Sequence, residues 1–218
     1  MPFVAVLFDL DGTLLDTIED LTDSMNAGLA AVACPPRTVA ECKFFVGEGV
    51  ELFATRSLPE GRRDAETLRR LIEVYRKDYA GHWVHKTRPY EGIPELLDAL
   101  AERKMKLAVL SNKPDDFTRL MVERLLPRWR FDAVAGARPS APRKPDPAAA
   151  LQIASGLGVA PSGFLYVGDT KTDMQTAVAA GMFAAGALWG YRSAEELLSS
   201  GARVLLKHPL DALPLLAP

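Results

Sequence analysis

Cysteine and histidine are both scarce in this sequence. Its 218 residues include two cysteines, Cys34 and Cys42, and three histidines. Two cysteines are too few for a disulfide framework, and they lack the spacing of a structural zinc site. A chain without disulfides is typical of a reducing compartment, so we expect a cytoplasmic protein.

The sequence also lacks a marked excess of charge of either sign and any long hydrophobic run. The formal net charge is −2, which indicates neither a nucleic-acid footprint nor a membrane-binding surface. No apolar run is long enough to span a bilayer, and the first residues do not form a secretory signal. Hydrophobic residues make up 48% of the chain and charged residues 25%, as in ordinary globular proteins. We therefore expect a folded protein that binds neither nucleic acid nor membrane, with a monomer and a homodimer both open.

What the chain does contain is an alternation of buried strands and amphipathic helices. Apolar and β-branched residues from Val4 to Phe8 predict a strand buried on both faces. From about residue 89 onward, short apolar runs alternate with helical patterns, which predicts βαβ units and a parallel sheet. Residues 17–88 show helical periodicity without a convincing strand, and Thr17 with Asp20 has the spacing of a capping box. The sequence thus predicts an α/β fold: a Rossmann-like parallel-sheet core of residues 1–16 and 89–218, with an inserted all-helical cap of residues 17–88.

Two carboxylates follow the first predicted strand. Asp9 and Asp11 stand two residues apart, ahead of Gly12, and an extended chain would place both side chains on one face. An Asp-Gly pair is also a common turn signal, so either acid alone could serve only the turn. Two like charges held this close repel each other unless a cation lies between them. The spacing therefore favours a metal site at the carboxyl end of this strand, the edge at which open parallel sheets carry their chemistry.

Further polar residues follow other predicted strands. Ser111 and Asn112 come after one, Asp169 and then Asp173 after another, and Lys144 precedes a predicted helix. Each has a structural alternative: Ser111 or Asn112 could cap a helix, Asp173 fits a capping box with Thr170, and Lys144 could be a solvated charge. Together they form a coherent set. Asp9, Asp11, Asp169 and Asp173 supply the oxygen ligands that Mg²⁺ prefers, and Ser111 and Lys144 supply donors for a phosphate. A carboxylate nucleophile in that setting indicates phosphoryl transfer through an aspartyl-phosphate.

The same residues resemble the motifs of the haloacid dehalogenase superfamily of phosphohydrolases. The motifs are Asp9-Leu10-Asp11-Gly12-Thr13-Leu14, Ser111-Asn112, Lys144-Pro145, and Gly168-Asp169 with Asp173. The resemblance implies that Asp9 is the nucleophile and that Asp11 is the general acid and then the base. It also implies phosphate binding by Ser111, Lys144 and the backbone around Asn112, with Lys144 holding Asp9 in place. The implied cofactor is Mg²⁺, held by Asp9, the backbone carbonyl of Asp11, Asp169 and Asp173, the last directly or through water.

Asp11 also separates branches within this resemblance. Dehalogenating members lack an acid at this position because a halide leaving group needs no proton, so the implied substrate is a small phosphorylated metabolite. The chain is most similar to the phosphoglycolate phosphatases, through features such as Val46-Gly47-Glu48-Gly49, Ser111-Asn112-Lys113 and Trp189-Gly190-Tyr191. β-Phosphoglucomutase-like phosphosugar mutases and pyrophosphatases share several of these features and stay open as alternatives. We expect Tyr191 and Arg192 at the surface.

Overall fold

The chain folds as two compact units in the computed structural model, which describes residues 3–139 and 141–216. One unit joins the residues up to Leu15 to those from Pro89 onward, and the other is Asp16–Arg88. The sequence places these boundaries after residues 16 and 88.

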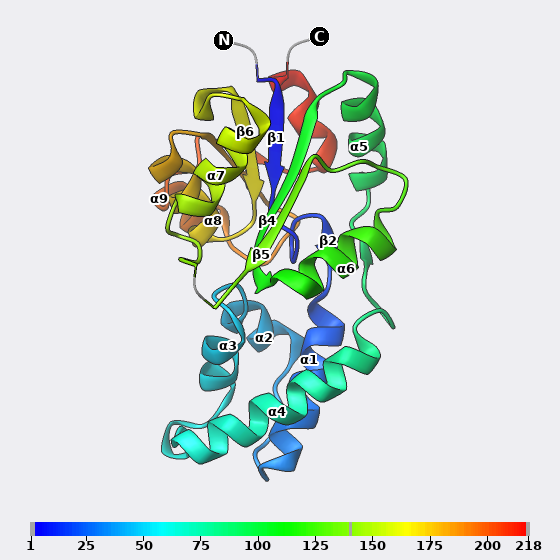
Figure 1. Cartoon of the computed structure of the whole chain (residues 1–218). Coiled ribbons are helices and arrows are strands. Elements are labelled where there is room, and N and C mark those ends of the chain that lie inside the picture. Colours follow the sequence, from blue (N-terminus) through cyan, green and yellow to red (C-terminus); the bar gives the residue numbers. More distant parts are fainter. Residues whose placement is uncertain (1–2, 140, 217–218) are drawn as a thin grey trace. The chain divides into compact units, whose positions relative to one another are not determined.

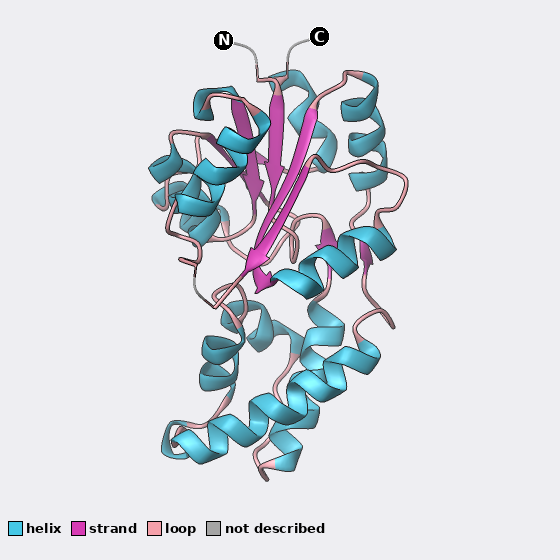
Figure 2. Ribbon diagram, in the orientation of Figure 1, coloured by secondary structure: helices cyan, strands magenta, loops and turns pink. Residues whose placement is uncertain are grey.

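A six-stranded sheet forms the centre of the first unit (Figure 1, Figure 2). Every pairing between neighbouring strands is parallel. The central strand β1 (Ala5–Phe8) has all four residues buried, as expected for an apolar run with strands on both sides. The strand order is β5-β4-β1-β6-β7-β8, with the bounds Ala133–Ala137, Lys106–Pro114, Ala5–Phe8, Phe164–Gly168, Phe183–Ala187 and Val204–Leu206. The prediction of an α/β fold with a parallel sheet is confirmed.

Helices cover both faces of this sheet. Ala5 and Leu7 of β1 belong to one core cluster with residues of α7 (Ala148–Leu157) and α8 (Lys171–Ala180). Side chains alternate along a strand, so Val6 and Phe8 point to the opposite face. The helices α5 (Ile93–Glu102) and α6 (Asp115–Leu125) lie on the other side of the sheet from α7 and α8 (Figure 1). The remaining bounds are Ala194–Ser199 for α9, and Pro161–Gly163 and Pro209–Leu215 for two 3₁₀ helices. All strands therefore present their carboxyl ends at one edge of a sheet that is buried on both faces.

Strand β4 is longer than the sequence pattern suggests. The apolar run predicts a strand that ends at Leu110, whereas β4 continues to Pro114. Its register against β5 shifts between Leu110 and Pro114, so the strand is irregular there. Polar residues in such an irregular stretch carry no strand pattern, which is why the sequence alone places Ser111 and Asn112 after the strand.

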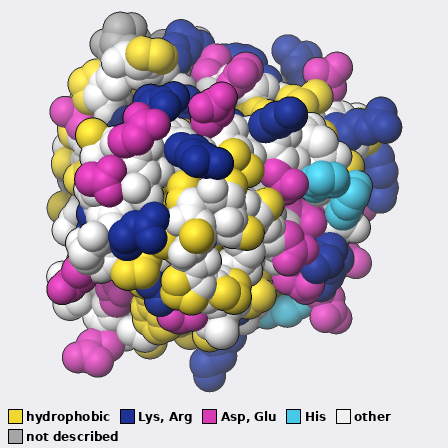
Figure 3. All heavy atoms as spheres, turned by 90° about the horizontal axis from the view of Figure 1, so that it is seen from below, with side chains coloured by type: hydrophobic (Ala, Val, Ile, Leu, Met, Phe, Trp, Pro, Cys, Tyr) yellow, Lys and Arg dark blue, Asp and Glu magenta, His cyan; other side chains and the backbone are white. Residues whose placement is uncertain are grey.

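The second unit is helical apart from its two ends. Its elements are α1 (Ile18–Ala31), α2 (Val39–Phe45), α3 (Val50–Ser57), a 3₁₀ turn (Glu60–Arg62) and α4 (Ala65–His82). Where the chain passes between the units, β2 (Leu15–Asp16) pairs with β3 (Arg88–Pro89) in a small separate sheet. None of the helices in the described residues combines the length and the apolar character needed to cross a membrane. Figure 3 shows one face of the molecule, on which Lys and Arg side chains are interspersed with Asp and Glu side chains.

The capping box predicted for Thr17 and Asp20 is wrong. Thr17 precedes α1 but makes no capping hydrogen bond with its side chain. The carboxylate of Asp20 instead accepts hydrogen bonds from the Lys86 N–H at 3.0 Å and from the Thr87 N–H at 2.9 Å and Oγ1 at 2.8 Å. Asp20 is 2% exposed. Tertiary partners from the far end of the same unit have replaced the local one.

Candidate active site

Asp9 lies where β1 ends. Its N–H donates to the carbonyl of Val167 at 3.0 Å, which extends the pairing with β6 by one residue. Its side chain is buried, and Oδ1 accepts hydrogen bonds from the Leu10 N–H at 2.7 Å and from Lys144 Nζ at 2.9 Å. Two donors therefore fix the orientation of this carboxylate at the carboxyl edge of the sheet.

Lys144 joins Asp9 to Asp173. Its Nζ lies 2.9 Å from Asp9 Oδ1, 2.7 Å from Asp173 Oδ1 and 3.0 Å from the carbonyl of Leu110. These contacts match the three donors of an ammonium group. Burial disfavours the charged form of Lys144, but Asp173 and Asp9 outweigh it and raise the pKa well above its usual value. The lysine is thus a buried, permanently charged group rather than a solvated one.

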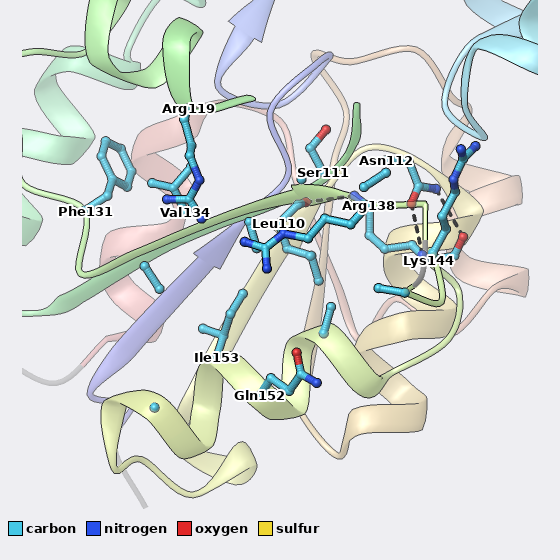
Figure 4. Close-up of a pocket in the computed structure, with 18 of the residues that line it drawn as sticks. Leu110, Ser111, Asn112, Arg119, Phe131, Val134, Arg138, Lys144, Gln152 and Ile153 are labelled. Atoms are coloured by element: carbon cyan, nitrogen blue, oxygen red, sulfur yellow. Dashed lines mark hydrogen bonds between the residues drawn. The ribbon is translucent and has the colours of Figure 1, made fainter. Parts of the chain in front are cut away.

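Asn112 positions Lys144 from the neighbouring strand (Figure 4). Its Nδ2 donates to the Lys144 carbonyl at 3.1 Å, and its Oδ1 accepts from the Lys144 N–H at 3.0 Å. This paired contact fastens the backbone before α7 to β4 and occupies the side-chain amide. A contribution of Asn112 to phosphate binding would therefore come through its backbone. Ser111, beside it, is buried, and its Oγ accepts from the Lys113 N–H at 3.2 Å.

Asp169 is oriented by two residues that the sequence does not predict as its partners. Its Oδ1 accepts from Thr13 Oγ1 at 2.9 Å, and its Oδ2 accepts from the Tyr191 N–H at 2.9 Å. The expectation that Tyr191 and Arg192 lie at the surface is wrong, because Tyr191 is 6% exposed and the side chain of Arg192 is 7% exposed. Tyr191 acts on Asp169 through its backbone, which no side-chain motif reveals. Thr13 is part of the first motif, and its hydroxyl is a hydrogen-bond donor that could have suggested a carboxylate partner.

Three glycines make room for these carboxylates. A Cβ at Gly12 would overlap the carboxylate of Asp169, and one at Gly190 would overlap Asp169 Cβ and the Gly12 carbonyl. A Cβ at Gly168 would overlap the side chain of Asp173. Gly12 also has φ = 85°, a conformation that glycine adopts without strain. These three positions therefore need glycine for Asp169 and Asp173 to occupy their places.

Asp9, Asp169 and Asp173 form a compact acidic cluster. Each offers a carboxylate oxygen that lies within 4.8 Å of the others. Burial, Asp173 and Asp169 raise the pKa of Asp9 well above its usual value, although Lys144 lowers it. Burial and Asp173 raise the pKa of Asp169 to about 7, against the lowering effect of its hydrogen bonds. Repulsion of this kind is relieved by a bound cation, and an all-oxygen donor set fits Mg²⁺.

Asp11 lies outside this cluster by its side chain. Its backbone bridges to Leu15, and its two carboxylate oxygens lie 3.1 Å and 3.0 Å from Lys113 Nζ. The side chain of Lys113 is 6% exposed and that of Asp11 16%. Lys113 belongs to the run Ser111-Asn112-Lys113, which resembles the phosphoglycolate phosphatases, but the sequence does not reveal its partner 102 positions away.

A cavity of about 470 Å³ lies beside Ser111 and Lys144 (Figure 4). Its apolar lining includes Phe131, Val134 and Ile153, contributed from around β5 and from α7. Arg119 and Arg138 also line it, but both guanidinium groups pair with Asp115. The cavity thus offers space next to the predicted phosphate-binding residues. The positive charges of Arg119 and Arg138 in its lining are compensated by Asp115.

The chain matches the model of a known protein family over the region that contains this site. The model of the haloacid dehalogenase-like hydrolases matches residues 6–187, which includes every predicted site residue. The chain belongs to this family. The resemblance inferred from the four motifs is confirmed, and with it the prediction of a hydrolase.

Relatives in this family cover most of the chain. A phosphoglycolate phosphatase of Xylella fastidiosa is 37% identical over 191 residues, which are 88% of this chain and 82% of the relative. A phosphoglycolate phosphatase of Aquifex aeolicus is 33% identical over 186 residues, 85% of each chain. A crystal structure of a Lactobacillus delbrueckii protein aligns over 100% of both chains with a TM-score of 0.92 and 31% identity. The whole fold of this haloacid dehalogenase-like hydrolase, and not only its sheet, is therefore shared with solved structures.

Proposed function

We propose that this hydrolase is a Mg²⁺-dependent phosphatase that acts on a small phosphate monoester, with phosphoglycolate as the foremost substrate. The observation that carries the proposal is the buried Asp9, held by Lys144 beside two further carboxylates. A carboxylate fixed by an ammonium group and next to a cation site is suited to attack phosphorus. The names of the relatives support phosphoglycolate as the substrate.

The proposed reaction has two steps. The Asp9 carboxylate attacks phosphorus, the bond to the leaving oxygen breaks, and Asp11 gives that oxygen its proton. Asp11 then takes a proton from water as the water oxygen attacks the aspartyl-phosphate, which releases phosphate and restores Asp9. Ser111, Lys144 and the backbone N–H of Asn112 bind the phosphoryl oxygens, and Lys144 also keeps Asp9 oriented.

Asp9, Asp169, Asp173 and the backbone carbonyl of Asp11 would hold Mg²⁺, which would supply positive charge to neutralise the phosphoryl group. The three side chains meet this requirement because their oxygens already converge. Asp173 has a further structural task, since its Oδ2 accepts from the Thr170 N–H at 3.0 Å and closes the capping box of α8. Its other oxygen, Oδ1, accepts a hydrogen bond from Lys144 Nζ. In the proposal Asp173 contacts the ion either directly or through a water molecule.

The domain assignment is part of the proposal. Residues 1–16 and 89–218 would be the catalytic core, and residues 17–88 the helical cap. The acidic cluster and Lys144 all lie in the first compact unit, which supports this division. We also propose a cytoplasmic monomer or homodimer, consistent with two cysteines that are free thiols.

Turnover of a panel of phosphate esters tests the proposed function. With Mg²⁺, phosphoglycolate should rank first by kcat/KM, and free phosphate should be the product. An isomerised sugar phosphate would favour the phosphosugar mutase instead, and pyrophosphate as the best substrate would favour the pyrophosphatase. Asp9→Asn should lower kcat by at least about 10⁴-fold. Asp98→Asn, the same change at a half-exposed carboxylate paired with Arg128, serves as the matched control.

A further inference from the structure

A partly buried ion pair links the ends of two neighbouring strands. Lys113 Nζ contacts both carboxylate oxygens of Asp11, at 3.1 Å and 3.0 Å, although the residues are 102 positions apart in sequence. The lysine side chain is 6% exposed and the aspartate 16%. An ammonium group taken out of water at this depth is costly unless a partner compensates it. A lysine here is therefore not a casual surface charge.

The backbone around Lys113 is itself fixed. Its N–H donates to Ser111 Oγ at 3.2 Å, and its carbonyl accepts from Thr118 Oγ1 at 3.2 Å. The residue lies in the irregular part of β4, where the register against β5 shifts. The local structure thus holds the lysine so that it projects toward the end of β1.

We infer that Lys113 is a positioning residue that aims the Asp11 carboxyl group for proton transfer. The inference rests on the proposed function, in which Asp11 protonates the leaving oxygen. A contact to both oxygens restricts rotation of the carboxylate. When Asp11 presents a proton to the leaving oxygen from one carboxyl oxygen, Lys113 can still donate to the other, so the carboxyl group stays oriented. The proton moves from Asp11 to the leaving oxygen as the P–O bond breaks, and Lys113 keeps its own protons throughout.

The nature of the leaving group distinguishes this role from a structural one. An alkoxide is a poor leaving group and needs the proton from Asp11, whereas p-nitrophenolate departs without it. The ratio kcat/KM includes only the steps up to departure of the leaving group. The role of Asp11 as the base that takes a proton from water comes later and does not affect this ratio. Lys113→Met should lower kcat/KM for phosphoglycolate by about 10- to 100-fold and for p-nitrophenyl phosphate by less than about 3-fold. Lys113→Arg, which keeps the charge, should restore part of the loss.

The double variant Asp11→Asn, Lys113→Met completes the experiment. Asp11→Asn should show the same selective loss for the alkyl ester, and Lys113→Met should add little to it because both changes remove one function. Lys106→Met, at a half-exposed lysine paired with Asp132, should leave the ratio between the two substrates unchanged. Equal losses on both substrates, or losses that multiply in the double variant, would overturn the positioning role. Full activity of Asp11→Asn on phosphoglycolate would instead overturn the proposed mechanism, so the two failures are distinguishable.

Discussion

At the scale of single residues, the site depends on glycines that leave space for the carboxylates as much as on the carboxylates themselves. Gly190 and Gly12 carry no Cβ where one would overlap Asp169 or its surroundings. Asp9, Ser111 and Asp169 could be found from the sequence as candidates, because they follow strands whose carboxyl ends share one edge, and Lys144 could be found through the motif Lys144-Pro145. Lys113 and Tyr191 could not, since one reaches Asp11 across the fold and the other acts through its backbone N–H.

The glycine at position 190 gives the first prediction. In Gly190→Ala the new methyl group would displace Asp169. The kcat/KM should therefore fall by at least about 10-fold, and the increase in Tm caused by Mg²⁺ should fall by about half. Gly156→Ala is the control, because a Cβ at Gly156 within α7 meets nothing within 4 Å. That variant should be unchanged or more stable by about 0.5–1 kcal/mol. If Mg²⁺ raised the Tm of Gly190→Ala as much as that of the wild type, the close approach of Gly190 to Asp169 would not be needed for metal binding.

A second prediction concerns pH and metal binding. Burial and Asp173 raise the pKa of Asp169 from 3.8 to about 7 in the metal-free protein. A carboxyl group with a raised pKa in the folded state stabilises the fold at low pH, and this contribution is lost as the pH rises through about 7. Mg²⁺ needs ionised ligands and relieves their repulsion, so it should raise Tm more at about pH 8 than at about pH 5.5.

Thermal unfolding with and without saturating Mg²⁺ measures this difference, with NaCl added to match the ionic strength. The increase at the higher pH should be about 5 °C or more. Asp169→Asn should lose most of it. An equal rise in Tm at both pH values would contradict the assignment of these carboxylates as ligands.

At the scale of elements, Asp20 shows why a local pattern misled. The Thr-x-x-Asp spacing fits a capping box at the start of α1, but Asp20 binds the backbone of Lys86 and Thr87. The two chain segments that lead into and out of the helical unit are thus tied together within it. A spacing rule considers only local partners, and here the long-range ones win.

The prediction for Asp20 concerns stability. Asp20→Ala would leave two backbone N–H groups and the Thr87 hydroxyl without their acceptor, so the free energy of unfolding should fall by about 3 kcal/mol. Asp23→Ala is the matched control, because Asp23 also pairs with residue 86, through Lys86 Nζ at 2.7 Å, but is exposed. Its Tm should stay close to that of the wild type. Chemical denaturation of both variants provides the comparison, and equal losses would contradict the clamping role of Asp20.

At the scale of the whole molecule, the order of strands and helices was largely predictable. Apolar runs alternating with helical patterns are sufficient to indicate a parallel sheet, and the pattern from residue 17 to 88 indicates helices alone. The length of β4 was not predictable, because its last residues are polar and irregular. The pairing of β2 with β3 was not predictable either, since strands of two residues leave no periodicity.

This organisation predicts that the core folds without the helical unit. Pairing of β2 with β3 brings together the chain on either side of the insert. Replacing residues 18–86 by a short Gly-Ser linker should therefore leave a folded protein that Mg²⁺ still stabilises, because the acidic cluster lies entirely in the first unit. Circular dichroism and thermal unfolding would test it. A shortened chain that is unfolded, or folded but indifferent to Mg²⁺, would contradict the division into catalytic core and cap.

The central claim is that Asp9 carries the phosphoryl group, and trapping that intermediate tests it most directly. The enzyme is mixed with phosphoglycolate and Mg²⁺, quenched in acid within milliseconds, digested, and analysed by mass spectrometry. We expect one added phosphoryl group on the peptide that contains Asp9, located at that residue, and none in Asp9→Asn. A phosphoryl group on Ser111 or any other residue would contradict the account, as would substrate turnover by Asp9→Asn at the wild-type rate.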